Sequence, residues 1–183
     1  MIIQFIPVQS EHMKLILHWR TSEEVTRYMF TDIENDLDKQ YQWWSRVSSK
    51  PTERYWLVQL KKEPIGLVSL NQIDEMNRRC SWAYYIGEQK HRIVGGMIPP
   101  YIYSYVFDFL KLNKVVAEVM EGNEAARRMH QAYGCREAGL LKEHIFKYGS
   151  FHDVYQYEML RSGWETLKKK CKRFDLKAFM DIA

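Results

Sequence analysis

The sequence predicts an α+β fold in which helices flank a central, mostly antiparallel mixed β-sheet. Short strand-like runs separated by turn residues fill the middle of the chain, and the last third alternates strand, helix and strand. The length of 183 residues is enough to bury one substantial core. We therefore expect one domain over residues 1–165, followed by a basic helical extension over residues 166–183.

The N-terminal part is predicted to begin with one strand and to continue as helices. Residues 2–8 form an apolar run typical of a strand. Ser10 is a suitable N-cap for a helix that extends to Arg20, and two further helical patterns follow over residues 22–29 and 36–47.

The middle of the chain changes to the two-residue period of strands. Residues 55–60 and 65–70 are joined by Lys61-Lys62-Glu63-Pro64, which is a hairpin pattern, and residues 80–87 form a third strand. A pair of glycines then interrupts the chain, and apolar residues recur at helical spacing up to Phe109.

The last third predicts a strand, a capped helix and two closing strands. Residues 114–120 have the pattern of a strand. Asn123 and Gly134 bracket a helix, because Asn is favoured at the N-cap and Gly just beyond the C-terminus. Residues 140–146 and 154–160 are expected to complete the sheet.

The composition excludes several classes of protein. Apolar residues make up 46% and charged residues 27% of the chain, which is ordinary for a globular domain. No apolar run approaches the roughly 18 residues of a membrane helix, and the first residues lack a secretory signal pattern, so we expect a cytoplasmic protein that does not bind membranes. The three widely spaced cysteines fit neither a disulfide framework nor a metal site.

The charge favours a small anionic ligand over nucleic acid. The formal net charge is +4, and residues 168–173 form a basic run. A solvated helix face explains this run better than nucleic-acid binding, because no aromatic residue is interleaved with it. Aromatic residues make up 14% of the chain, which fits either a ring-stacking substrate pocket or a thick core.

The segment around the paired glycines has the pattern of a pyrophosphate-binding loop. A strand that leads into glycines and then into a helix N-terminus presents backbone N–H groups and the positive end of a helix dipole. Pro99 and Pro100 occupy the first helical turn, where a missing N–H costs little. An ordinary tight turn is the alternative. The candidate donors are the N–H groups of Val94, Gly95, Gly96, Met97 and Ile98.

The order of these elements resembles the GNAT superfamily of acetyl-CoA-dependent N-acetyltransferases. Residues 92–97 are similar to its Gln/Arg-x-x-Gly-x-Gly/Ala loop except at Met97, and residues 123–135 to its Asn-x-x-Ala-x-x-apolar-Tyr/His-x-x-x-Gly-Phe segment. The resemblance implies a V-shaped cofactor cleft, acetyl-CoA as cosubstrate and no metal. The cofactor-binding residues that it implies are Tyr85, Ile86, Gly87, Arg92, Val94, Gly95, Gly96, Met97, Ile98, Asn123 and Arg127.

The resemblance also implies two catalytic residues. The Asn123 side chain is expected to bond the pantetheine arm, and His130 to reach the thioester sulfur. Because an unperturbed histidine titrates at about pH 6.5, we expect His130 to donate a proton to the departing thiolate. The alternative is an N-cap residue followed by a surface histidine.

The general base is expected on the strand that precedes the Asn helix. Glu118 and Glu121 are three residues apart, so an extended strand points them to opposite faces. We expect Glu118 to act as base, directly or through water, because Glu121 lies beside the turn at Gly122. Two alternatives are a solvent-facing carboxylate and water alone.

The outer segments indicate the acceptor. Residues 17–29 resemble the Leu-x-Trp-Arg-Asn-Ser-x-x-Val-Arg-x-x-Met signature of UDP-4-amino-4,6-dideoxy-N-acetyl-β-L-altrosamine N-acetyltransferases of pseudaminic acid biosynthesis, and residues 118–123 and 139–155 continue the likeness. This implies acetylation of the 4-amino group of a UDP-linked amino sugar, for nonulosonic acids used in surface or flagellin glycosylation. The expected substrate-binding residues are Arg20, Met29, Phe30, Trp43 and Tyr84, each of which could instead belong to the core.

Three alternatives remain at this point. A GNAT enzyme of a protein N-terminus, as in the ribosomal-protein type, or of a polyamine would need an acidic cleft for its cationic acceptor. A non-catalytic acyl-CoA-binding module would keep Gly95 and Gly96 but would tolerate the loss of His130 and Glu118. The sequence leaves a homodimer open.

Overall fold

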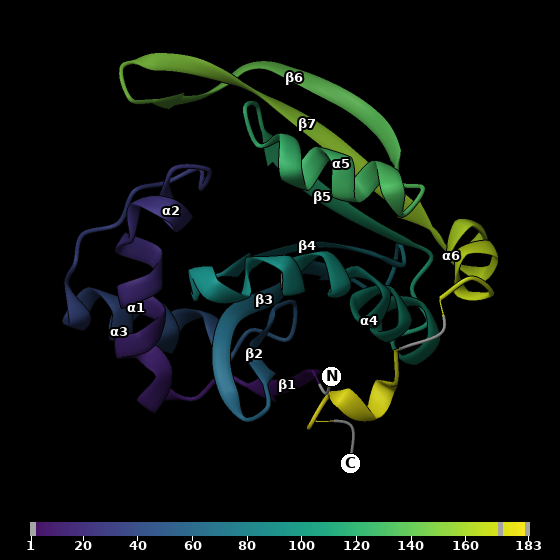
Figure 1. Ribbon diagram of the computed structural model, residues 1–183, viewed down its shortest axis with the longest axis horizontal. Coiled ribbons are helices and arrows are strands. Elements are labelled where there is room, and N and C mark those ends of the chain that lie inside the picture. Colours follow the sequence, from purple (N-terminus) through teal and green to yellow (C-terminus); the bar gives the residue numbers. More distant parts are fainter. Residues whose placement is uncertain (1–2, 172–173, 182–183) are drawn as a thin grey trace.

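The computed structural model, which describes residues 3–171 and 174–181, confirms the predicted α+β class (Figure 1). One seven-stranded sheet has the order β1-β2-β3-β4-β5-β7-β6. Neighbouring strands are antiparallel except for β4 and β5, which are parallel. The strands are β1 (Ile3–Pro7), β2 (Arg54–Leu60), β3 (Glu63–Asp74), β4 (Arg79–Ile86), β5 (Lys114–Met120), β6 (Arg136–Lys147) and β7 (Ser150–Leu160).

Helices cover both faces of this sheet (Figure 1). They are α1 (Met13–Thr21), α2 (Glu23–Thr26), α3 (Leu37–Val47), α4 (Pro99–Ser104), α5 (Glu124–Ala132) and α6 (Arg161–Lys168), with the 3₁₀ segments η1 (Ser10–His12), η2 (Gln89–Met97) and η4 (Leu176–Ala178) and the π-helical turn η3 (Tyr105–Phe109). Within the described ranges, no helix is long and apolar enough to cross a membrane.

Three helix-end residues are predicted from the sequence, and the structure confirms Asn123 and Gly134 but not Ser10, while Asp36 is a further cap. Asp36 caps α3 by accepting from the backbone N–H of Lys39 at 3.0 Å. Asn123 caps α5 in the same way, and Gly134 beyond its end has a φ of +74°, which favours glycine. The prediction of Ser10 as an N-cap is wrong, because Gln9 holds that position and its N–H donates to Nδ1 of His12.

Two hairpins differ in length from their predictions. The β2–β3 turn is tighter than expected, since only Lys61 and Lys62 leave the ladder, both with positive φ, as in the primed turns that match strand twist. The β6–β7 hairpin extends several residues beyond the predicted strands and turns at Tyr148 and Gly149. Its tip projects past the body of the protein in Figure 1.

The C-terminal part packs back onto the body of the domain. Phe179 is buried and stacks on Phe5 of β1 with ring centroids 4.3 Å apart. The N–H of Met180 also donates to the carbonyl of Phe5 at 3.0 Å. Residue 2 of the predicted first strand and residues 172–173 and 182–183 of the expected extension lie outside the described residues.

The sheet splits between its two parallel strands. β4 and β5 pair only over three residues, from Arg79 and Lys114 to Ser81 and Val116, and then separate. One half, β1 to β4, packs against α1 and α3 on one face and against α4 on the other. The other half, β5, β7 and β6, carries α5 (Figure 1).

Candidate functional site

A cleft of about 1290 Å³ lies where β4 and β5 separate. Its lining brings together residues from the first, middle and last parts of the chain. The sequence-predicted residues that line it are Arg20, Met29, Phe30, Tyr84, Tyr85, Ile86, Arg92, Gly95, Gly96, Glu118, Asn123 and His130. The predicted residues that lie outside this lining are Trp43, Gly87, Val94, Met97, Ile98 and Arg127.

The paired glycines lie at the mouth of the cleft, within η2. A Cβ atom at Gly95 would lie 3.1 Å from Cε2 of Tyr84, so this glycine allows close packing, whereas a Cβ at Gly96 would meet no atom within 4 Å. The hydroxyl of Tyr133 donates to the carbonyl of Gly96 at 2.7 Å and ties the end of α5 to this loop. The open side of Gly96 therefore lets a ligand approach the backbone closely.

The expected set of free backbone donors needs one correction. The segment is a 3₁₀ helix rather than an open loop, and the N–H of Ile98 donates to the carbonyl of Gly95 at 3.2 Å. Pro99 and Pro100 follow at the start of α4 and bring no N–H groups. The other expected donors, the N–H groups of residues 94–97, lie inside this 3₁₀ segment, where an N–H can bond the carbonyl three residues earlier.

Asn123 holds the start of α5 at the edge of the cleft. Its side-chain oxygen accepts from the N–H of Ala126 at 3.3 Å, and its amide nitrogen takes no part in this cap. Arg127, one turn later, was predicted to bind the cofactor. In the structure its guanidinium lies 3.7 Å above the Tyr155 ring and pairs with Glu124 at 2.9 Å, and the residue is outside the cleft lining.

Two further predicted residues have structural surroundings instead. A Cβ at Gly87 would fall 2.2 Å from the Trp19 ring, so this glycine makes room for α1. Trp43 packs edge-on against Tyr55 at 5.4 Å between α3 and β2 and does not reach the cleft. Both residues lie on the α1 side of the sheet, where they shape the core.

Tyr84 and Tyr85 point to opposite faces of the sheet, because successive strand residues alternate. Tyr84, predicted to bind substrate, stacks on Trp82 and donates to Sδ of Met129 at 3.0 Å, on the side of the glycines. Tyr85, predicted to bind cofactor, packs beside Trp19 on the side of α1. The Tyr84 side chain thus faces the glycine loop and the Tyr85 side chain faces α1, and we call these two parts of the cleft the cofactor side and the acceptor side after the roles proposed below.

His130 is buried, contrary to the picture of a surface histidine. Only 4% of the residue is exposed, its ring stacks on Tyr157 at 5.0 Å, and Trp82 meets it edge-on. Burial lowers its pKa to about 4, which corrects the expected titration near neutrality. At pH 7 the imidazole is therefore neutral, and its Nδ1 is buried without a hydrogen-bond partner in the part of the chain that the structure describes.

Glu118 points into the cleft from β5, while Glu121 does not line it. The Glu118 residue is exposed, and its Oε1 accepts from Nε2 of Gln156, its partner on β7, at 2.9 Å. Glu121 lies beside Nδ1 of His152 at 3.2 Å. Of the two predicted carboxylates, Glu118 is the one with access to the cleft, and sequence reasoning missed its partner Gln156.

Arg20 and Tyr85 place two buried polar groups on the acceptor side. Nη2 of Arg20 donates to the carbonyl of Thr31 at 3.1 Å. Nη1 of Arg20 and the hydroxyl of Tyr85 are buried without a hydrogen-bond partner among the described residues. Burial lowers the pKa of Arg20, although the neighbouring Tyr85 and Asp32 act in the opposite direction. Buried donors of this kind need an acceptor, which a ligand can supply.

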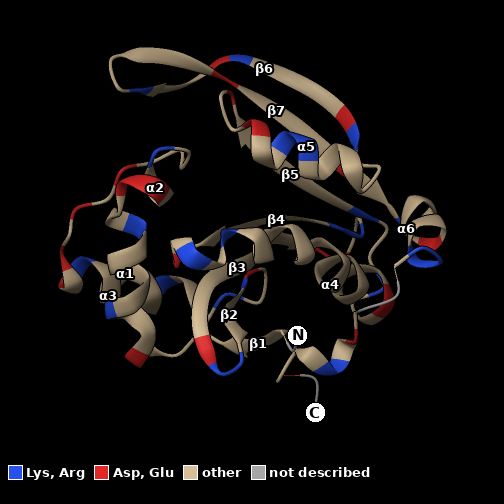
Figure 2. Cartoon of the chain, viewed as in Figure 1, with Lys and Arg blue, Asp and Glu red and all other residues tan. Residues whose placement is uncertain are grey.

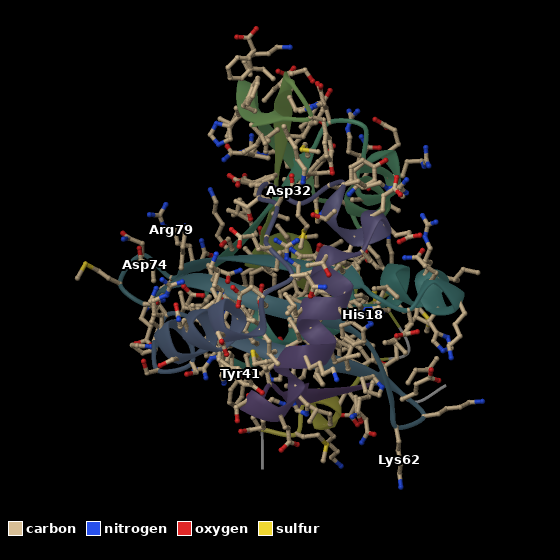
Figure 3. The ribbon with its side chains drawn as sticks, turned by 90° about the vertical axis from the view of Figure 1, so that its left-hand side faces the viewer. His18, Asp32, Tyr41, Lys62, Asp74 and Arg79 are labelled. Carbon is tan, nitrogen blue, oxygen red and sulfur yellow. The ribbon has the colours of Figure 1, made fainter. Side chains whose placement is uncertain are left out.

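The carboxylates at the far end of the cleft are already paired with cations. Asp74 lies 3.4 Å from Nε of Arg79, and the two are adjacent in Figure 3. Glu158 is held by Lys114 at 2.7 Å and by Arg136.

Basic and acidic residues also occur together on α5 and on α6 (Figure 2). Among the residues that the structure describes, no group of His, Cys, Asp and Glu side chains is arranged to hold a metal ion.

Comparisons with known proteins agree on the fold and differ in the acceptor. Residues 3–136 match the model of the acetyltransferase (GNAT) domain. The chain is 30% identical over 105 residues to the putative ribosomal N-acetyltransferase YdaF of Bacillus subtilis, covering 56% of this chain and 57% of that protein. It is 24% identical to the acetyltransferase PseH of Campylobacter jejuni, covering 89% and 95%. The solved spermidine N-acetyltransferase from Vibrio cholerae, in complex with CoA and spermine, superposes with a TM-score of 0.83 at 22% identity, covering 89% and 98%.

Proposed function

The chain belongs to the GNAT acetyltransferase family, and we propose that it transfers the acetyl group of acetyl-CoA to the 4-amino group of a UDP-linked amino sugar. Acetyl-CoA as cosubstrate and an amine as acceptor follow from the family. The proposal concerns the acceptor and its place in nonulosonic, pseudaminic-type acid biosynthesis. It draws support from the nearly full-length likeness to PseH, whose identity of 24% leaves the acceptor to be argued from the cleft.

The observation that carries the proposal is the polarity of the acceptor side. Nη1 of Arg20 and the hydroxyl of Tyr85 are buried and have no partner within the described part of the chain, which suits the oxygens of a diphosphate. Met29 and Phe30 lie along the same part of the lining and offer apolar surface for a base or a deoxy sugar. A nucleotide-sugar combines these chemical groups in one molecule.

A polyamine acceptor fits this lining less well. A polycation needs several unpaired carboxylates, yet Asp74 and Glu158 are each held by a basic side chain. Among the described residues, this leaves Glu24 and Glu118 as the lining carboxylates outside an ion pair. Arg20 and Arg92 also line the cleft and would repel a polyamine.

The proposed chemistry places the amine between Glu118 and the thioester. Glu118, directly or through a water, removes a proton from the acceptor ammonium, and the neutral nitrogen then attacks the thioester carbonyl carbon. The C–S bond breaks as the tetrahedral intermediate collapses, the thiolate of coenzyme A leaves with its electron pair, and the nitrogen loses its second proton to solvent, which leaves a neutral amide. The neutral imidazole of His130 donates a hydrogen bond toward this sulfur, and the thiolate is protonated from solvent.

The cofactor side is proposed to hold the coenzyme along the other face of β4. The backbone of residues 94–97, with Gly96 open toward the ligand, binds the diphosphate, and Arg92 at the lining adds a positive charge. The amide nitrogen of Asn123 donates to the pantetheine arm. Tyr84 and Ile86 form the wall beside that arm.

The decisive experiment incubates the purified protein with acetyl-CoA and three acceptors, namely a UDP-4-amino-4,6-dideoxy sugar, spermidine and a ribosomal-type N-terminal peptide, and follows free thiol. We expect turnover of the UDP-sugar. Turnover of spermidine or the peptide without the sugar would contradict the proposed acceptor. The variant Arg20→Met should raise the KM for the UDP-sugar by about 10- to 100-fold, the loss of one charged hydrogen bond, and should leave coenzyme A affinity unchanged.

A further inference from the structure

A buried lysine joins the tip of the β6–β7 hairpin to the segment that walls the acceptor side. Lys147 is the last residue of β6, and only 4% of it is exposed. Its Nζ donates to the carbonyl of Thr26 at 2.7 Å and to that of Met29 at 2.8 Å, and lies 2.7 Å from Oδ1 of Asp32. Because an ammonium has three donors, these three oxygens satisfy it completely.

The three acceptors of Lys147 belong to residues 26–32, which we call the acceptor wall. The wall follows the end of α2 and has no helix or strand of its own after Thr26. Met29, Phe30 and Thr31 of this wall line the cleft. The carbonyl of Thr31 also accepts from Arg20, so Lys147 and Arg20 hold the same segment from two sides.

Two further hydrogen bonds hold this network in place, one at the carboxylate of Asp32 and one at the backbone carbonyl of Lys147. Asp32 accepts from the hydroxyl of Thr26 at 2.9 Å as well as from Lys147, and these two hydrogen bonds lower the pKa of its carboxyl. Figure 3 shows Asp32 below the projecting hairpin. At the other end, the carbonyl of Lys147 lies 3.0 Å from Nε2 of His152. The ammonium group of Lys147 on the hairpin is therefore held in a fixed position against the acceptor wall.

A role in packing alone does not explain a lysine here. Burying an ammonium costs desolvation energy, and an apolar side chain of similar size would fill the same space without that cost. What the ammonium adds is the orientation of two carbonyls and one carboxylate in a segment without regular structure. We propose that Lys147 is a positioning residue that fixes the acceptor wall and thereby sets the binding of the acceptor amine. This rests on the proposed function in one respect, namely that residues 29–31 face the acceptor.

The test compares Lys147→Met with Lys142→Met. The control lysine lies on the same strand, is exposed and pairs with Asp153 at 2.7 Å, away from the acceptor wall. Two measurements do not depend on the acceptor: tryptic cleavage at the exposed Arg27, identified by mass, and calorimetric affinity for coenzyme A. For Lys147→Met we expect about tenfold faster cleavage at Arg27 as the wall opens locally, with coenzyme A affinity within about twofold of the native protein.

The kinetic arm measures KM and kcat with the UDP-4-amino sugar. We expect KM to rise about tenfold in Lys147→Met with kcat within about twofold, because the wall binds the acceptor without taking part in bond breaking. Cleavage and KM equal to those of Lys142→Met would overturn the proposal, and so would a parallel loss of coenzyme A affinity. If the native protein does not use the UDP-sugar, the proposed function fails, and the kinetic arm uses the acceptor that the panel identifies.

A second variant covers the case in which Lys147→Met does not fold. Asp32→Ala changes a side chain that is 57% exposed and removes one arm of the same network. We expect the same changes in cleavage and KM, at about threefold, since a partly exposed ion pair contributes less than a buried one. Native values for both would overturn the proposal.

Discussion

The two sides of the cleft, which we propose to hold the cofactor and the acceptor, are built in different ways. The cofactor side comes from one stretch of chain between Tyr84 and His130, in which a strand, a glycine-containing 3₁₀ segment and a capped helix follow one another. The acceptor side is assembled from Arg20, the acceptor wall, Tyr85 and Glu118, which lie on four separate segments. The first side therefore depends on local backbone conformation, and the second on side chains that meet only in the folded protein.

This difference separates cofactor recognition from acceptor recognition. A substitution in the acceptor wall leaves the glycines and the Asn123 cap in place, so a changed acceptor need not change coenzyme affinity. That separation agrees with relatives that share the fold but carry names for ribosomal, spermidine and other acetyltransferases. The following predictions test whether the two sides are as independent as their construction suggests.

The largest effect is expected from Glu118→Gln on the acceptor side. The amide cannot accept a proton, so kcat should fall by about 10³-fold, within the range for loss of a general base. Coenzyme A affinity should not change, because the carboxylate faces Gln156 and the cleft, not the glycines. Steady-state kinetics and calorimetry measure the two quantities.

The matched control for this variant is Glu121→Gln. Glu121 lies on the same chain segment but beside His152 and outside the cleft lining, so its kcat should stay within about twofold of the native value. If the two variants lose equal activity, neither carboxylate is the specific base, and the assignment of Glu118 is wrong.

The next largest effect is expected on the pH dependence of stability, and it comes from the buried side chain of His130. Its pKa of about 4 in the folded protein lies below the value of about 6.5 expected for the unfolded chain. Between these values the unfolded chain binds a proton that the native protein does not. Stability should therefore fall as pH drops from about 6.5 to about 4, by roughly 3 kcal/mol across the window.

Urea denaturation at several pH values measures this slope. His130→Phe keeps an aromatic ring for stacking on Tyr157 but cannot titrate, so it should lose this contribution to the slope. The exposed His18 of α1, labelled in Figure 3, provides the control, and His18→Gln should keep the native pH dependence. A native slope in His130→Phe would show that the imidazole is not buried as described.

The smallest effect is expected at the glycine loop. A Cβ at Gly96 would meet no protein atom within 4 Å, so Gly96→Ala should keep the native melting temperature. The added methyl group would stand where the diphosphate approaches the backbone, and coenzyme A should bind about tenfold more weakly. Unchanged affinity would mean that the diphosphate binds elsewhere, and a lower affinity for the acceptor would mean that the two sides are coupled.

Local patterns predicted much of the fold because their causes are local. The predicted range of β5, residues 114–120, agrees with the structure at both ends, and α5 starts and stops at its predicted cap residues. Errors appear where a neighbour in space decides the outcome. Alternation along β4 made it certain that Tyr84 and Tyr85 face opposite sides, but only the packing of α1 against one face decided which side each tyrosine takes.

The sequence by itself determined the class of fold, the glycine loop and the capped helix, since each depends on backbone preferences within a few residues. The candidates His130 and Glu118 came from the resemblance to the GNAT superfamily that these patterns carry. The tertiary structure alone decided that His130 is buried and neutral, that Arg127 turns away from the cleft, and that Lys147 reaches the acceptor wall. Burial, solvation and long-range hydrogen bonds depend on which distant segments meet, and no local pattern in the chain encodes them.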